Sequence, residues 1–159
     1  MKYLLTVAAS LATLTASPAL AIDGTADALQ EVIADLSIAK DRDLNFGSAP
    51  RNDGPKTIDS SSNDTDSAQF TVTGNPSTAY TVTVPAGTVT MQKGAGGTAD
   101  TEIDVTGFTY YSETTSAQNS ASTGVGGTDQ LRIGAQRDPI GATEEVGNFS
   151  GNFTVTVVY

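Results

Sequence analysis

Large apolar side chains alternate with polar ones over the last nine residues of the chain, 151–159. They occupy every second position, so an extended backbone places all of them on one face. Their aromatic and β-branched character also favours a strand. The pattern predicts a closing β-strand, and full burial of its four apolar side chains would contribute roughly 6–12 kcal/mol. These four side chains are Phe153, Val155, Val157 and Tyr159.

The same period of two recurs through the middle of the chain, between stretches rich in Gly, Asn, Pro and Ser. Residues 74–77 are typical of a tight turn, so we expect the strands on either side of them to form a hairpin. Gly107 stands inside another alternating run and predicts a bulge there. The segments predicted to be strands are 68–74, 79–85, 88–93, 102–111, 130–136 and 146–159.

The remaining stretches predict loops. Residues 49–67 are dense in Pro, Gly, Asn, Asp and Ser. Residues 112–129 carry few side chains that a core would bury, so we expect that loop to be exposed and mobile. No segment beyond the first 21 residues predicts a helix. The expected fold is therefore all-β, an antiparallel immunoglobulin-like β-sandwich of about seven to nine short strands.

One segment near the amino terminus fits two patterns. Residues 29–36 carry apolar side chains at helical spacing, whereas Val32, Ala34, Leu36 and Ile38 alternate as a strand would. We expect a strand, because the segments that follow also predict strands. It could pair within its own domain, or it could be donated to a neighbouring subunit that lacks one strand. Both arrangements bury the same face, so the residues leave both open.

Residues 1–21 predict a secretory signal peptide. Lys2 supplies the positive charge, a short apolar stretch follows, and a small-x-small cleavage pattern ends at Ala21. No later segment is apolar for long enough to span a bilayer, so we expect no transmembrane segment. The rest of the chain, 22–159, is expected to form a single β-sandwich domain, with residues 22–40 as an amino-terminal extension able to act as the donor strand.

Cysteine and histidine are both absent, and acidic residues outnumber basic ones. Their absence excludes Ser-His-Asp and Cys-His catalysis and zinc sites built from cysteine or histidine. After loss of the signal, seven basic and 18 acidic residues leave a net charge of −11. Such a surface repels phosphate backbones and anionic lipid. We therefore expect a protein that is not an enzyme, needs no cofactor and does not bind nucleic acid.

Residues 41–47 resemble the start of a calcium-binding loop, because oxygen ligands stand at alternate positions. The glycine, however, comes one position late, and Asn52 occupies the place of the bidentate glutamate. We interpret this stretch instead as the beginning of a strand whose Leu44 and Phe46 side chains turn inward.

Asp59, Asp64 and Asp66 lie close together in one predicted loop and are weak candidates for a surface calcium site. Acidic loops are usually just solvated, so we assign no metal site to them. Glu144 and Glu145 are adjacent, and in a strand they would point to opposite faces rather than form a catalytic pair. We expect both of these glutamates to be surface charges.

Several segments together resemble a bacterial secreted family that is catalogued only as a domain of unknown function and is itself similar to spore-coat-U-type and chaperone-usher pilins. The Leu-x-Phe-Gly motif at 44–47 and the closing Phe-Thr-Val-Thr-Val-x-Tyr strand are distinctive as an ordered pair. Gly147 precedes Tyr159 by twelve residues, close to the spacing in such pilins. Tyr159 is last rather than next to last, and the cysteine pair common in pilins is missing. The segments that carry the resemblance are 36–47, 68–74, 80–85, 131–134 and 147–159.

The resemblance implies a subunit of a surface fibre in a Gram-negative bacterium, located in the periplasm, at the cell surface or in an extracellular fibre. It further implies a periplasmic chaperone and an outer-membrane assembly pore as partners, besides copies of the chain or related subunits. The expected function is a structural subunit of a pilus-like or surface-coat assembly that polymerises by β-strand complementation. The donated face would be Val32, Ala34, Leu36 and Ile38, and the face of the accepting closing strand would be Gly147, Phe153, Val155, Val157 and Tyr159.

The alternative function is a self-contained secreted β-sandwich binding module, either adhesive or calcium-binding. It would use the loop at 112–129 or the acidic loop at 59–66. The two functions differ in oligomeric state, because a binding module predicts a monomer and a fibre subunit predicts exchange of strands between chains.

Overall fold

A computed structural model describes residues 25–61, 65–95 and 97–159 of the protein. Residues 32–159 belong to one compact unit. Residues 25–31 belong to a second unit, and all of them are exposed and without regular secondary structure. The predicted signal peptide and Asp64 lie outside the described residues. Within the described ranges, no helix is long and apolar enough to cross a membrane.

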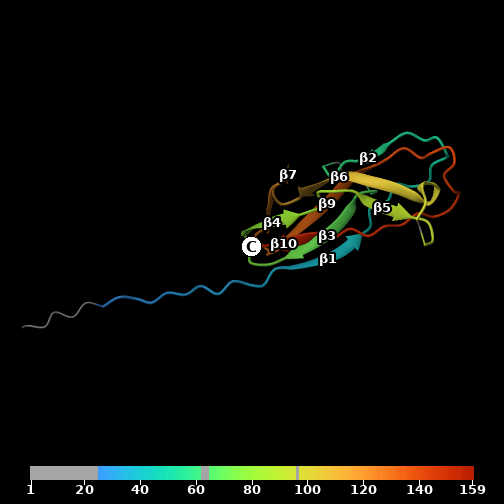
Figure 1. The fold of residues 1–159 in the computed structure, drawn as a ribbon. Coiled ribbons are helices and arrows are strands. Elements are labelled where there is room, and N and C mark those ends of the chain that lie inside the picture. The colour runs from blue at the N-terminus through green and yellow to red at the C-terminus, as the bar shows by residue number, and fades with distance from the viewer. Residues whose placement is uncertain (1–24, 62–64, 96) are drawn as a thin grey trace, which may run out of the picture. The chain divides into compact units, whose positions relative to one another are not determined.

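The regular structure of the described residues consists almost entirely of strands, which confirms the all-β prediction (Figure 1). A single 3-10 turn, η1 (Ala99–Thr101), precedes the longest strand. The strands are β1 (Ser37–Arg42), β2 (Lys56–Ile58), β3 (Ala68–Thr73), β4 (Ala79–Thr83), β5 (Val89–Gln92), β6 (Glu102–Ser112), β7 (Ala117–Gln118), β8 (Ala121–Ser122), β9 (Thr128–Arg137) and β10 (Thr156–Val158).

Strand β9 lies at the centre of a seven-stranded antiparallel sheet. The order of this sheet is β1-β3-β9-β6-β5, with β2 beside β9 and β7 beside β6. The alternating residues Leu131, Ile133 and Ala135 of β9 are at most 2% exposed. Their near-complete burial explains why this short apolar run occupies the middle of the sheet.

Strand β6 contains the bulge that its glycine predicts. Gly107 has a φ of +62°, in the left-handed region that favours glycine. The pairing of β6 with β9 shifts register between Thr106 and Thr109, around this residue. The bulge re-aims the side chains that follow, and Phe108 next to it is 9% exposed and belongs to the core.

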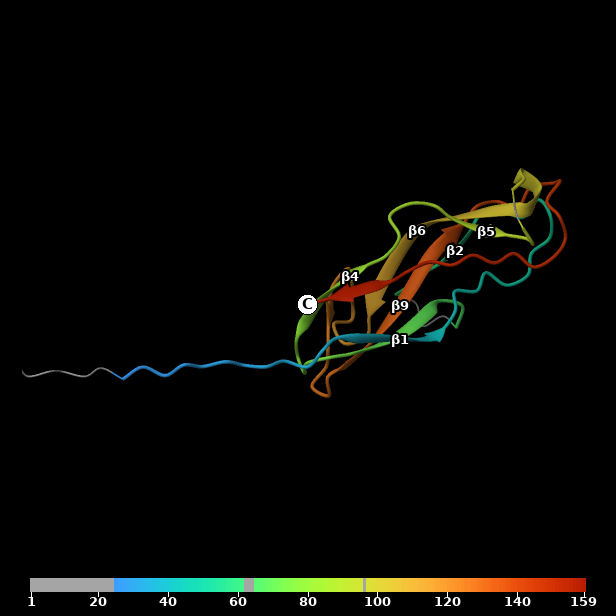
Figure 2. The same ribbon diagram turned by 60° about the horizontal axis from the view of Figure 1, so that its bottom comes forward.

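Strands β10, β4 and β8 form a second sheet of three strands. Tyr80 and Val82 of β4 pack in one buried cluster with Val72 of β3 and Leu131 of β9. The core therefore lies between the two sheets, and the body is an antiparallel β-sandwich (Figure 2). The two layers are unequal, because three short strands face a sheet of seven.

The predicted hairpin between residues 68–74 and 79–85 is wrong, although both strands exist. β3 pairs with β1 and β9 in the large sheet, whereas β4 pairs with β10 and β8 in the small sheet. The connection crosses between layers, and the Gly74 N–H donates to the Gly127 carbonyl there. The alternating pattern fits either arrangement, because it specifies only which side chains face the core. Val72 and Tyr80 face the same core from opposite sheets.

The two predicted loops contain more structure than their polar composition indicates. Residues 49–67 include β2, whose Ile58 is 2% exposed. Residues 112–129 include β7 and β8, and Ala121 and Thr123 in that stretch are buried. The prediction that this second loop is exposed throughout is therefore wrong. Backbone hydrogen bonds and small side chains order these segments, and neither leaves an apolar period in the sequence.

The first strand begins later than predicted. β1 starts at Ser37 and pairs antiparallel with β3 of the same chain, so residues 32–36 are not part of a strand. Leu36 and Ile38 are half-buried against the core of their own chain, whereas Val32 and Ala34 are exposed. The predicted donor face is thus divided between packed and exposed residues.

Candidate functional site: a seam between two sheet edges

The closing segment is less regular than predicted. Only Thr156–Val158 forms a strand, paired with β4, and a single isolated bridge joins Ser150 to Gln92 at the end of β5. Between these contacts, residues 151–155 run past the connection from β4 to β5. Pro85 in that connection has no N–H to donate to a ladder. In the described structure, this five-residue stretch has no ladder partner on either side.

The alternating apolar side chains of this segment face the core but remain half-buried. Phe153, Val155 and Val157 pack against the buried clusters, and the ring centre of Phe153 lies 5.2 Å from that of Phe108. Tyr159 is 44% exposed. The four side chains are therefore not fully buried, whereas the estimate of roughly 6–12 kcal/mol assumed full burial. Their contribution to stability is smaller in proportion to the apolar area that stays exposed.

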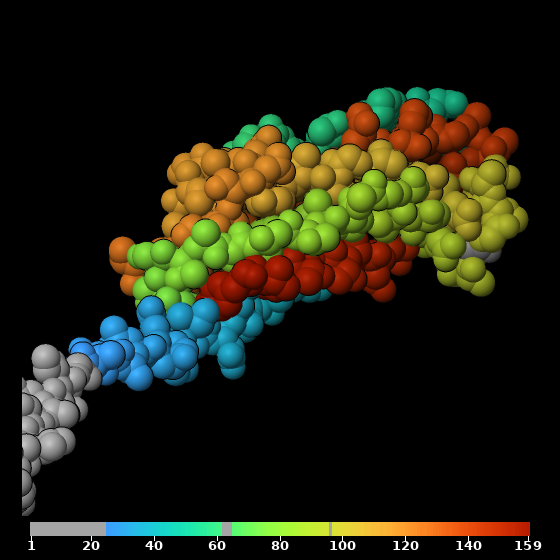
Figure 3. Space-filling view, turned by 60° about the vertical axis from the view of Figure 1, so that its left-hand side comes forward, coloured from blue at the N-terminus to red at the C-terminus, as the bar shows by residue number. Residues whose placement is uncertain are grey.

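A second set of half-buried apolar side chains lies on the first strand and the residues after it. They pack against the same two core clusters, and β1 and β10 are edge strands of their sheets. We call the strip between residues 36–46 and residues 149–157 the seam. Figure 3 shows the closing segment exposed beside β4, with β1 on its other side. The side chains along this side of the seam are Leu36, Ile38, Leu44 and Phe46.

One end of the seam is closed by the last residue. The Tyr159 hydroxyl accepts a hydrogen bond from the Asn75 N–H. A Cβ atom on Gly74 would lie 2.3 Å from that hydroxyl and 2.7 Å from Cδ1 of Leu36. Gly74 therefore leaves room for both the Tyr159 hydroxyl and the Leu36 side chain at this end of the seam.

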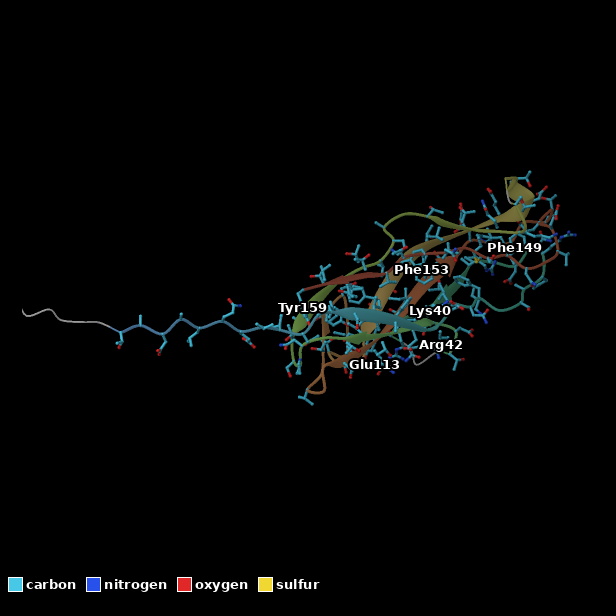
Figure 4. All side chains as sticks on the ribbon, turned by 90° about the horizontal axis from the view of Figure 1, so that it is seen from below. Lys40, Arg42, Glu113, Phe149, Phe153 and Tyr159 are labelled. Atoms are coloured by element: carbon cyan, nitrogen blue, oxygen red, sulfur yellow. The ribbon has the colours of Figure 1, made fainter. Side chains whose placement is uncertain are left out.

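The other end of the seam is open. A cavity of about 590 Å³ is lined by residues from 44–51, from 140–149 and from strands β5 and β6. A smaller cavity of about 40 Å³ lies beside Phe153. Both cavities share Leu44, Phe46 and Met91 as lining residues, so an apolar surface continues from the open end into the seam. Figure 4 places Phe149 and Phe153 along the closing segment, away from Tyr159.

Most charged groups around the open end are paired. Arg137 is 3% exposed, and its guanidinium donates to the Asp53 carboxylate at 2.7 Å. Lys93 forms an ion pair with Glu145. In each of these two pairs the opposite charges offset each other.

Arg51 and Glu144 differ from these pairs. Arg51 is exposed, its Nε donates to the Glu144 carbonyl, and no carboxylate among the described residues lies within ion-pair distance of its guanidinium. Glu144 is 6% exposed, so the prediction of a surface charge is wrong for it, and its Oε1 has no hydrogen-bond partner in the described structure. Sequence reasoning missed Arg51, because one arginine in a polar loop belongs to no period.

The acidic residues proposed for calcium have other partners. Asp59 is exposed and accepts hydrogen bonds from the backbone N–H and the hydroxyl of Ser61, which hold the pKa of its carboxyl below the usual range. Asp66 lies 3.5 Å from the Lys56 ammonium. Among the described residues, no group of three or more acidic side chains is placed so that it could hold a metal ion.

The residues that resemble a calcium loop have separate partners as well. Asp41 accepts a hydrogen bond from the Thr71 hydroxyl at 2.7 Å, and Asp43 pairs with Lys40 at 2.7 Å. Leu44 and Phe46 pack against the core as predicted, but β1 ends at Arg42, so the prediction that a strand begins here is wrong. This stretch therefore behaves as the end of a strand and one wall of the seam.

A buried carboxylate lies at the far side of the core from the cavity residues. Asp129 is 3% exposed and accepts hydrogen bonds from the Tyr80 hydroxyl at 2.6 Å, the Ser112 hydroxyl at 2.7 Å and the Thr114 N–H at 3.0 Å. These hydrogen bonds connect Asp129 of β9 to β4, to the last residue of β6 and to the residues that follow β6. The sequence signal for its burial is its alternation with Leu131 in the same strand.

Burial raises the pKa of Tyr80, and its hydrogen bond to Asp129 raises that pKa further. A raised pKa in the folded state stabilises the fold below the unfolded value of about 10, and this contribution is lost as the pH rises above it. We expect the free energy of unfolding to fall by about 1.4 kcal/mol per pH unit above pH ~10 because of this one proton. Tyr80→Phe should remove that part of the slope. Urea unfolding at several alkaline pH values measures it, and equal slopes for the two proteins would contradict the assignment.

Comparison with known proteins gives one family. Residues 36–159 match the family described as "Domain of unknown function (DUF4402)". The match covers β1 to β10 and both sides of the seam, and it begins after the exposed residues 25–35. Neither the curated proteins nor the solved structures that were compared with the chain gave a match.

Proposed function

The chain belongs to the DUF4402 family, whose description assigns no activity, and from its seam we propose that it is a structural subunit of a pilus-like or surface-coat assembly. Copies would join by adding a strand of one chain to the seam of the next. The observation that carries the proposal is the unpaired stretch 151–155 beside half-buried apolar side chains and an open cavity. An added strand would supply backbone hydrogen bonds to this edge, which is how β-augmentation binds.

The amino-terminal extension is the segment proposed for donation. Leu29 is 92% exposed and Val32 is 88% exposed, which is unusual for two large apolar residues so close together. Each half-buried side chain of the seam would gain roughly 1 kcal/mol from complete burial under such a strand. Leu36 and Ile38 already pack in their own chain, so the donated residues in this proposal are those before Leu36.

The proposal includes export. Residues 1–21 would direct the chain to the periplasm of a Gram-negative bacterium, and a chaperone and an outer-membrane assembly pore would handle it there. The support for these partners is the resemblance of the closing segment to that of pilins, together with an edge that would need protection before assembly.

The test is the size of the protein, produced from Ile22 onward, before and after heating in mild denaturant and cooling. We expect light scattering to detect oligomers that resist dilution. Replacing both exposed residues of the extension, Leu29→Asp with Val32→Asp, should leave monomers with unchanged stability, because neither side chain is packed.

The matched control is Val125→Asp, which changes a valine that is 91% exposed in a different part of the chain. It should assemble as the unchanged protein does. A wild-type protein that stays monomeric, or a Leu29/Val32 variant that assembles normally, would contradict strand donation by the extension.

A self-contained binding module is the alternative, and the cavity favours it over other monomeric functions. The cavity at the open end of the seam has a volume of about 590 Å³, which lies within the range of small-molecule sites. A monomeric wild-type protein in the same measurement would make this the leading function.

A further inference from the structure

The open end of the seam combines an apolar floor with an exposed arginine. Phe46, Met91 and Ile103 contribute apolar surface to the cavity, and Arg51 lines it. Arg137 and Glu145 also line the cavity, but each has its own ion-pair partner. The arrangement suits an apolar group that enters the cavity together with an anion that stays at the rim.

The extension has the complementary composition. Residues 25–36 contain three carboxylates and no Lys or Arg, and Leu29 and Val32 stand among them. Adjacent residues of an extended strand point to opposite faces, so a strand that buries Val32 leaves Glu31 pointing outward. The acidic residues of the extension are Asp27, Glu31 and Asp35.

We infer that Arg51 is a specificity-determining residue of the seam and binds a carboxylate of the extension of a second copy, with Val32 of that copy entering the cavity. This inference rests on the proposed strand donation. It adds which end of the seam the donated residue Val32 enters and which charged group recognises the donated segment. Glu144 does not replace Arg51 as the recognition charge, because it is nearly completely buried and the arginine is the exposed group. A single ion pair at the rim mainly sets specificity, and a larger part of the affinity comes from the buried apolar residues.

The experiment measures the dissociation constant of assembly by sedimentation, in mild denaturant where copies exchange, for four proteins produced from Ile22 onward. They are the unchanged chain, Arg51→Gln, a variant with Asp27→Asn, Glu31→Gln and Asp35→Asn, and the combination of all four changes. We expect Arg51→Gln and the triple acid variant each to weaken assembly by about 2-fold to 5-fold, in the range of exposed ion pairs. The combination should be no weaker than either parent, because the pair is lost only once.

Gln130→Glu is the matched control, since it lowers the net charge by the same one unit on β9, where the Gln130 side-chain oxygen accepts a hydrogen bond from Gln69. It should not alter assembly. Added salt should weaken assembly of the unchanged chain relative to that of Arg51→Gln, because salt screens exposed ion pairs.

Each outcome separates this inference from the proposed function. Assembly that is lost in Leu29→Asp with Val32→Asp but equals wild type in Arg51→Gln would overturn the role of Arg51 and leave strand donation standing. If the fold-changes in the dissociation constant caused by Arg51→Gln and by the triple acid variant multiplied in the combined protein, the two groups would act independently. That result would overturn their pairing. A monomeric wild-type chain would overturn both.

Discussion

Replacing Asp129 by alanine is expected to lower the free energy of unfolding by about 3–5 kcal/mol, the largest effect of any single substitution proposed for this protein. The carboxylate accepts three hydrogen bonds inside the sandwich, two of them from the hydroxyls of Tyr80 and Ser112. After truncation, these donors remain buried without an acceptor. Urea unfolding followed by circular dichroism measures the change.

Asp104→Ala is the matched control, because Asp104 also accepts a hydrogen bond, from Thr90, but is exposed. We expect it to cost less than about 1 kcal/mol. Adding Tyr80→Phe to Asp129→Ala should cause no further loss, because the orphaned Tyr80 hydroxyl is then gone. Equal costs for Asp129→Ala and Asp104→Ala would show that the buried network contributes little.

Gly134→Ala is expected to destabilise the fold by about 3 kcal/mol, at the upper end for overpacking. A Cβ at this position would lie 2.2 Å from the Ile58 carbonyl oxygen and 2.5 Å from the Ser60 nitrogen. Both obstacles are backbone atoms of the segment that leaves β2 and crosses β9. Accommodation therefore requires that segment to move, which would also disturb the three-residue strand β2.

Gly54→Ala is the control for Gly134→Ala. Gly54 lies just before the same β2 strand, and an added Cβ there meets no atom within 4 Å. Its replacement should be neutral or stabilise by up to about 1 kcal/mol through the unfolded chain. If both alanine variants were equally stable in urea, the close crossing at Gly134 would not constrain the fold.

The core strands could be predicted from the sequence, because the buried residues on one face of each strand recur at every second position. Phe70 and Val72 of β3, Val105 of β6 and Leu131 of β9 all follow the period of two. The bulge was also predictable, since Gly107 interrupts an otherwise regular run. The candidate site was predictable only in part: the closing segment was found, but Arg51 on the opposite side of its open end was not.

The alternating residues of the sequence by themselves determined that this chain is an all-β protein, which residues of its main strands face the core, and that an apolar segment packs against that core near residue 159. Only the tertiary structure decided which strands pair, because alternation specifies a face and not a neighbour. It placed β3 and β4 in different sheets, gave residues 151–155 no ladder partner among the described residues, and divided the predicted donor face at Leu36. These outcomes depend on contacts between residues far apart in the chain, such as the hydrogen bond from the Asn75 N–H to the Tyr159 hydroxyl, and no local pattern records them.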